Sequence, residues 1–236
     1  MIPLRDNVPT RTFPAVTLGL IAANAIVWFW EIGGKTSLET DVVHYGYYPC
    51  KVDGPCIDLA LQAKVSWWEG AFSSMFMHGG WEHIIFNMLF LWIFGNNIED
   101  SMGRPRFLLF YLLGGIVAAY TQALLTAGST VPAIGASGAI AGVLGGYLLL
   151  FPRARVLTVL LVIFFVTIIE IPAAILLAIW FVLQFLPALG QVTTSAAGGE
   201  GVAYWAHVGG FVFGLAAIKL FATRDRAKAL GPQGIP

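Results

Sequence analysis

The chain has 236 residues, of which 58% are hydrophobic and 11% are charged, and its formal net charge at pH 7 is zero. A soluble domain carries about twice that fraction of charged residues. The composition therefore excludes an ordinary soluble protein and indicates a protein that crosses a membrane several times. The zero net charge gives no reason to expect nucleic acid as a partner.

The membrane-spanning segments are expected from apolar runs of about 20 residues, the length that crosses the hydrocarbon core. The first run lacks a small-residue cleavage site at its end, so we expect a retained span and not a signal peptide. The sequence predicts an all-α polytopic fold with six transmembrane helices, at residues 14–32, 81–98, 107–127, 134–151, 171–189 and 202–221. Together they form a membrane domain at 14–221, between tails at 1–13 and 222–236.

Lysine and arginine predict the orientation of these spans. With six crossings, ten of the thirteen basic residues fall on one face together with both termini, and that face is expected to be cytoplasmic. The apolar stretch 156–189 is long enough for one span or for two short ones. One crossing, at 171–189, keeps the basic C-terminal tail on the cytoplasmic face, so residues 156–170 are interpreted as interfacial or re-entrant. We expect the membrane to be a bacterial plasma membrane.

Between the first two spans lies a large non-cytoplasmic loop, residues 33–76. Its paired tryptophans, Trp67 and Trp68, favour either a helix at the membrane interface or ordinary packing of the loop onto the bundle. Cys50 and Cys56 flank turn residues and are a candidate disulfide in an oxidising compartment. Free thiols or half of a metal site are the alternatives, but a zinc site needs about four ligands.

Two polar residues stand out in the apolar segments. Ser137 lies in Gly135-Ala136-Ser137-Gly138, within a stretch free of charged residues, and His207 opens the last span. Serine and histidine are the minimum pair for nucleophilic catalysis by an alcohol, and polar groups placed in lipid are usually functional. We read residues 130–132, which include Pro132, as a helix entry, with Ser137 about one turn inside.

Small residues predict how the two spans meet. Glycines at 135, 138, 142 and 145 form one close-packing face, and Gly210 and Gly214 form another on the helix of His207. Such packing would bring His207 to Ser137. On the second span His83 and Asn87 share a face, just after His78, and could polarise a carbonyl. A metal site formed by the histidines has no supporting carboxylate motif. With no acidic residue near Ser137 or His207 in the sequence, a Ser-His dyad is predicted.

These motifs resemble those of the rhomboid intramembrane serine proteases. The matching pieces are His78-x4-His83-x3-Asn87, Gly135-Ala136-Ser137-Gly138 and Ala206-His207-x2-Gly210-x3-Gly214, in the expected order. The resemblance implies that Ser137 is the nucleophile, that His207 is the general base, and that His83 and Asn87 stabilise the oxyanion. It also implies cleavage of transmembrane segments of other membrane proteins, without metal, nucleotide or other cofactor.

Two positions differ from many relatives. Ala141 stands where an aromatic residue often stacks on the base histidine, and Glu69 follows Trp68 where an arginine is usual. The family resemblance also suggests the fifth span, with Trp180, Phe181 and Phe185, as a lateral gate for substrate. The competing hypothesis is a catalytically inactive rhomboid-like protein that binds transmembrane clients.

Overall fold

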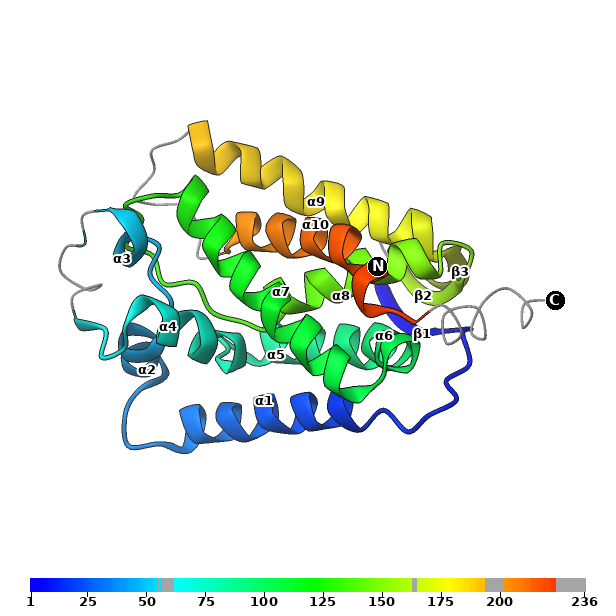
Figure 1. The fold of residues 1–236 in the computed structure, drawn as a ribbon, viewed down its shortest axis with the longest axis horizontal. Helices are drawn as coiled ribbons and strands as arrows, with labels where there is room; N and C mark the ends of the chain where they lie inside the picture. Colours follow the sequence, from blue (N-terminus) through cyan, green and yellow to red (C-terminus); the bar gives the residue numbers. More distant parts are fainter. Residues whose placement is uncertain (55, 57–61, 163–164, 194–201, 224–236) are drawn as a thin grey trace.

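The computed structural model of the protein describes residues 1–54, 56, 62–162, 165–193 and 202–223. Most of this part of the chain is helical (Figure 1). In chain order the elements are β1 (Ile2–Asp6), α1 (Ala15–Gly33), α2 (Leu38–Tyr45), α3 (Cys50–Asp53), α4 (Trp67–Ser73), η2 (Ser74–Phe76), α5 (Trp81–Phe90), η3 (Leu91–Gly95), α6 (Asn96–Met102), α7 (Arg104–Leu125), α8 (Ser137–Leu150), β2 (Arg155–Val162), β3 (Phe165–Pro172), α9 (Ala173–Thr193) and α10 (Tyr204–Phe221).

Each predicted span coincides with helical structure, but the helices differ in length. Among the described residues, α1, α7, α9 and α10 are long and apolar enough to cross a membrane. The second predicted span is the consecutive run α5, η3 and α6, in which η3 is a π-helical segment. The fourth, α8, has only 14 residues, or about 21 Å at the usual helical rise. Six crossings therefore stay a prediction.

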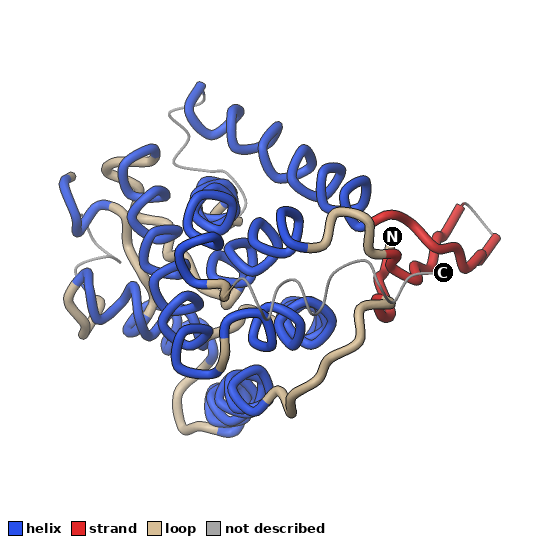
Figure 2. Tube along the Cα trace, turned by 45° about the vertical axis from the view of Figure 1, so that its right-hand side comes forward, coloured by secondary structure: helices blue, strands red, loops and turns tan. Residues whose placement is uncertain are grey.

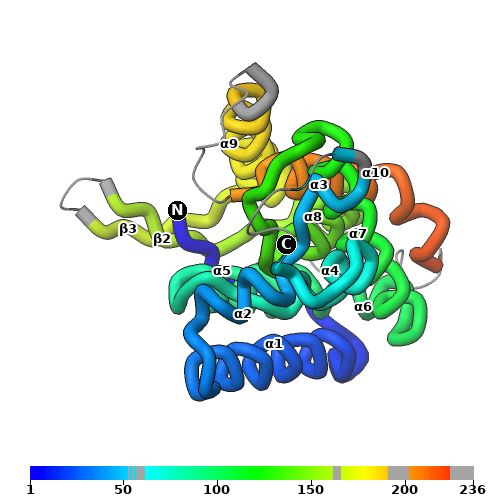
Figure 3. Tube along the Cα trace, turned by 90° about the vertical axis from the view of Figure 1, so that its left-hand side faces the viewer, coloured from blue at the N-terminus to red at the C-terminus, as the bar shows by residue number. Residues whose placement is uncertain are grey.

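Helix α8 forms the centre of the bundle. Every residue from Gly138 to Tyr147 is buried, and α8 packs against α7, α9 and α10. Seen along the bundle, α1 and α9 lie on opposite sides of this core (Figure 3). Both outer helices present large apolar side chains outward, including Phe29 at 60% exposure and Leu186 at 61%. Such surfaces suit contact with lipid.

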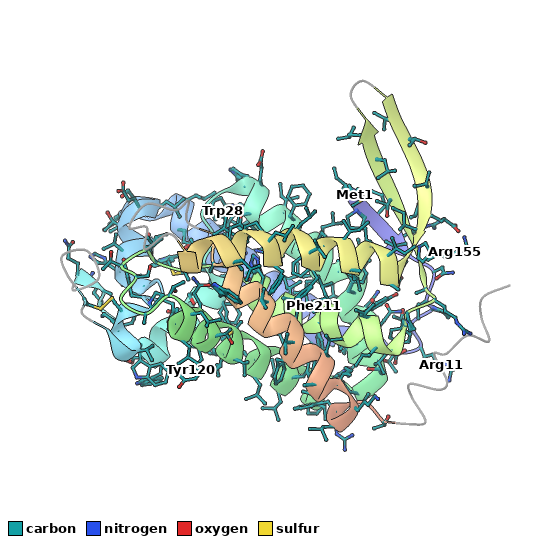
Figure 4. All side chains as sticks on the ribbon, turned by 90° about the horizontal axis from the view of Figure 1, so that it is seen from above. Met1, Arg11, Trp28, Tyr120, Arg155 and Phe211 are labelled. Carbon is teal, nitrogen blue, oxygen red and sulfur yellow. A yellow bond between two sulfur atoms is a disulfide. The ribbon has the colours of Figure 1, made fainter. Side chains whose placement is uncertain are left out.

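The expectation of an all-α fold is wrong for residues 156–162 and 165–170, which form strands. Strands β1, β2 and β3 form an antiparallel sheet in that order, with Val156 opposite Ile171 and Val162 opposite Phe165. The segment is rich in β-branched residues, which pack well in strands. The β2–β3 hairpin projects from one end of the bundle (Figures 2 and 4). An open sheet edge is not tolerated within hydrocarbon, so an interfacial position of the hairpin stays our prediction.

The two ends of the bundle differ in character. Arg11 and Arg155 lie at the end from which the hairpin projects (Figure 4). Helices α2, α3 and α4 of the predicted loop lie at the opposite end (Figure 1). At the first end, Glu99 accepts hydrogen bonds from the N–H groups of Val16 and Thr17 at 3.0 and 2.8 Å. A carboxylate there satisfies backbone donors at the start of α1 and interacts favourably with its dipole.

The loop at the other end is held by local contacts. A disulfide joins Cys50 and Cys56, so the alternatives of free thiols and a half metal site do not apply in this structure. Glu69 caps α4, accepting from the N–H and hydroxyl of Ser66 at 2.8 and 2.7 Å. This capping box gives Glu69 a local role. Trp67 and Trp68 are 43% and 60% exposed, which favours the interface reading of α4 over packing onto the bundle.

The buried carboxyl group of Asp6 is expected to make the free energy of unfolding depend on pH. The hydroxyl of Tyr147 in α8 donates to Asp6 Oδ2, and burial raises the pKa of Asp6 from 3.8 to about 6. The folded state therefore binds the carboxyl proton of Asp6 more tightly than the unfolded state does. The resulting stabilisation is fully present below the unfolded pKa and is lost as the pH rises through the folded pKa of about 6. The loss corresponds to about 2 kcal/mol between pH 4 and pH 7.

We therefore expect Asp6→Asn to flatten the pH dependence of the free energy of unfolding between pH 4 and pH 7. Thermal unfolding in detergent across this range measures the effect. Glu39→Gln is the control, because Glu39 is exposed at the start of α2. An unchanged slope in Asp6→Asn would contradict the assignment.

Candidate active site

The segment before Ser137 is extended and not helical, which corrects the predicted helix entry at 130–132. Ala133 exchanges backbone hydrogen bonds with Tyr47 at 3.1 and 2.7 Å, and the N–H of Gly135 donates to Ser74 O at 2.8 Å. Pro132 disfavours helical geometry in the residue before it, and Gly135 has a φ of +117°. Helix α8 therefore begins at Ser137 itself.

This start has two consequences for Ser137. As the first helical residue it carries a backbone N–H without an acceptor inside the helix, at the positive end of the helix dipole. Since α8 is short and central, its first residue lies within the bundle and not at its end. Non-helical backbone at membrane depth is tolerated where it is buried in protein or lines a wet cavity. The extended segment is thus consistent with a polar site at Ser137.

Close approach of α8 and α10 brings histidine to serine. A Cβ added at Gly210 would lie 2.0 Å from Gly138 O, and one at Gly214 would lie 2.0 Å from Gly142 O. Both neighbours are backbone atoms, so any larger residue at either position would force α8 and α10 apart. At the start of this contact, His207 Nε2 lies 2.7 Å from Ser137 Oγ. The two residues, seventy positions apart in sequence, form the hydrogen bond that general-base activation needs.

His83 also lies close to the serine. Its Nδ1 accepts the N–H of Gly79 at 3.4 Å, which leaves the ring proton on Nε2. A Cβ added at Gly135 would lie 2.6 Å from this Nε2 and 3.4 Å from Ser137 Oγ. The glycine is therefore required both by its positive φ and by the close approach of the imidazole. The Nε2–H donor of His83 thus lies beside the serine.

Asn87 lies one turn further along the same face of α5 as His83. It is 7% exposed, and its Nδ2 has no hydrogen-bond partner in the described structure. An unpartnered buried donor is costly unless it serves a ligand or water. His78 lies just before α5, fully buried, with its ring 5.0 Å from that of His83. Its position supports the His83 ring and does not reach Ser137 directly.

Two amides that the sequence reasoning missed complete the surroundings of His207. Gln184 Oε1 in α9 lies 2.8 Å from His207 Nδ1. Gln122 Oε1 in α7 accepts the N–H of Ala206 at 3.1 Å and so holds the start of α10. The signal was present in the sequence, because Gln184 is an isolated amide in an apolar span and such residues are usually functional. Within the part of the chain that the structure describes, no three His, Cys, Asp or Glu side chains gather as metal ligands.

Fold and site together define a helical membrane protein with a serine–histidine pair held inside the bundle. Residues 64–224 match the family model described as the Rhomboid domain. The chain belongs to the rhomboid family, as the motifs predict.

Individual curated relatives share modest sequence identity with the chain, over part of its length. The chain is 36% identical over 137 residues to "Rhomboid protease GluP" of Bacillus subtilis (strain 168), covering 57% of this chain and 24% of the relative. It is 29% identical over 139 residues to "Putative rhomboid protease YdcA" of the same organism, covering 58% and 63%. "Presenilin-associated rhomboid-like protein A, mitochondrial" of Danio rerio is 36% identical over 90 residues, covering 37% and 24%. The chain thus spans less than two thirds of the length of these relatives.

Proposed function

We propose that the protein is an intramembrane serine endopeptidase that hydrolyses peptide bonds in or near transmembrane segments of other membrane proteins. The observation that carries this proposal is the 2.7 Å contact between His207 Nε2 and Ser137 Oγ at the start of α8. Family membership and the two bacterial relatives named as proteases support it. The competing function, client binding without catalysis, has no use for a preformed serine–histidine hydrogen bond.

The reaction begins when His207 accepts the hydroxyl proton as Ser137 Oγ bonds to the carbonyl carbon of the substrate. Three donors are available for the oxyanion: His83 Nε2–H, Asn87 Nδ2–H and the backbone N–H of Ser137. Collapse of the intermediate breaks the C–N bond, and His207 gives its proton to the leaving amine. Water then attacks the acyl-serine, with His207 again the base, and releases the new carboxylate. The chain's own residues supply each proton transfer.

The substrate must reach this site from the bilayer. We propose that the protein is integral to a bacterial plasma membrane with both termini in the cytoplasm. The basic residues at the β-sheet end of the bundle support that orientation. In this arrangement the start of α8 faces the non-cytoplasmic half of the membrane. Water enters from that side, and the substrate helix approaches between α9 and its neighbours.

Reconstituted vesicles test this function. The purified protein is incorporated together with a reporter, which is a single transmembrane helix tagged at both ends. In one version the non-cytoplasmic end of this helix contains glycine or proline, and in the other version the helix consists of leucine throughout. Helix-breaking residues favour the extended backbone that a nucleophile needs. We expect a cut in or beside the helix of the first reporter. If the folded protein binds the reporters but cuts none of them, the client-binding alternative is favoured.

The oxyanion donors give a quantitative prediction. Asn87→Ala should lower kcat on the cleaved reporter by about 10²–10³-fold with little change in KM, because the lost hydrogen bond forms with the transition state. Asn96→Ala is a control in the same helical run, since among the described residues Asn96 Oδ1 accepts from the local backbone N–H of Asn97 alone. Equal kcat values for Asn87→Ala and the wild type would remove Asn87 from the mechanism.

A further inference from the structure

The second ring nitrogen of His207 determines whether the first can act as a base. An imidazole that accepts a proton at Nε2 must carry its own proton on Nδ1. In the structure, Nδ1 lies 2.8 Å from Gln184 Oε1, and an amide oxygen can only accept. The Gln184 contact therefore selects the tautomer in which Nε2 presents its lone pair to Ser137.

Other neighbours of His207 restrain the ring without selecting the tautomer. Position 141 of α8 is a fully buried alanine, so no aromatic ring of α8 stacks on the imidazole there. The rings of Trp180 and Tyr204 lie 6.0 and 6.3 Å from it, tilted by 41° and 86°. Such contacts limit how the ring tilts. An acceptor at Nδ1 does select the tautomer, because only a protonated Nδ1 can donate to it.

We propose that Gln184 is the positioning residue of the Ser137–His207 pair. It accepts a hydrogen bond from the histidine Nδ1, as the aspartate does in a Ser-His-Asp triad. This inference rests on the proposed protease function. A carboxylate in the membrane interior would carry a large desolvation penalty. The neutral amide fixes the tautomer without that penalty, so the pair is better described as a Ser-His-Gln arrangement than as a bare dyad.

The location of Gln184 links the site to the outermost helix. Ser137 comes from α8, His207 from α10 and Gln184 from α9, whose neighbouring side chains Val182 and Leu183 are 48% and 58% exposed. A substrate that pushes α9 aside would also withdraw the acceptor from His207. Full support of the base therefore requires α9 to be in the position that the structure shows.

The test compares three variants on the cleaved reporter. Gln184→Met keeps the length of the side chain and removes the acceptor, and Gln184→Glu keeps an acceptor and adds charge. Leu183→Met is the matched control on the lipid-facing side of α9. We expect Gln184→Met to lower kcat by about 10–100-fold with little change in KM, and the control to behave as the wild type.

The pH profile separates positioning from a merely structural role. Gln184→Glu should retain most of the activity, because its carboxyl group keeps an oxygen that accepts from Nδ1 whether or not it is ionised. It should also move the acid limb of the kcat profile to higher pH, since a carboxylate favours the protonated imidazole. Wild-type kcat in Gln184→Met, or equal losses in both variants with an unshifted profile, would overturn the proposal.

A spectroscopic measurement makes this inference separable from the proposed function. In protein with ¹⁵N-labelled histidine, His207 can be assigned among the four histidines by comparison with His207→Ala. We expect the wild type to hold its proton on Nδ1 and Gln184→Met to gain the Nε2–H tautomer. If that change occurs in a protein that cuts no reporter, the positioning role stands and the protease assignment fails. If the tautomer is unchanged in an active protein, Gln184 has no such role.

Discussion

Ser137→Ala is expected to abolish cleavage of a transmembrane reporter, with a loss of about 10⁴-fold or more, while the protein remains folded. The substitution removes the only atom that the mechanism bonds to the substrate, and loss of a nucleophile has effects of this size in serine proteases. The fold should survive, because within the described structure the hydroxyl makes one hydrogen bond, to His207, worth about 1 kcal/mol. Reporter cleavage and thermal unfolding in detergent measure the two effects separately.

A second serine provides the control for this change. Ser129→Ala alters the extended segment before α8 and, in the part of the chain that the structure describes, removes only a 3.3 Å contact to the N–H of Val131. Its cleavage rate should equal that of the wild type. Ser137→Ala protein that still cuts the reporter at the same bond would show that another group is the nucleophile.

Gly210→Ala should strongly destabilise the fold. The new Cβ would lie 2.0 Å from Gly138 O and 3.3 Å from the Cβ of Ala141, and the first of these neighbours is backbone. Relief requires α8 and α10 to separate, which loses packing along the whole contact and moves His207 from Ser137. We expect the free energy of unfolding to fall by about 3 kcal/mol and cleavage to be lost. Thermal unfolding and the reporter assay measure both.

The control for this prediction is Gly19→Ala in α1. A Cβ at Gly19 meets nothing within 4 Å, so the exchange should be neutral or slightly stabilising, given the higher helix propensity of alanine. If Gly210→Ala and Gly19→Ala unfolded at the same temperature, close packing of α8 on α10 would not be a determinant of the fold.

The sequence predicted the features that depend on residue chemistry and spacing. Long apolar runs locate the helices, and the spaced motifs around His83, Ser137 and His207 predict the family. Glycines at the spacing of a helical face predict that two helices pack closely. These inferences succeed because each depends on a local pattern that has few alternative structures.

Features that depend on tertiary contacts were not predictable in the same way. The hairpin of β2 and β3 is apolar enough to be taken for membrane-embedded chain, and pairing with β1 is a contact across more than a hundred residues. Helix α8 begins late because residues near Ala133 bond to the distant Tyr47. Gln184 comes to His207 only through the packing of α9 on α10. In each case a long-range partner decides the local structure.

Activation of Ser137 by His207 is tested most directly by covalent labelling of the detergent-solubilised protein with a fluorophosphonate. The modified residue is then identified by peptide mass spectrometry. Wild-type protein is compared with Ser137→Ala and His207→Ala, after each is shown to be folded. We expect one adduct, on Ser137, that is absent from both variants, because the hydroxyl reacts only when His207 accepts its proton. A folded wild type without an adduct, or an equal adduct in His207→Ala, would contradict this expectation.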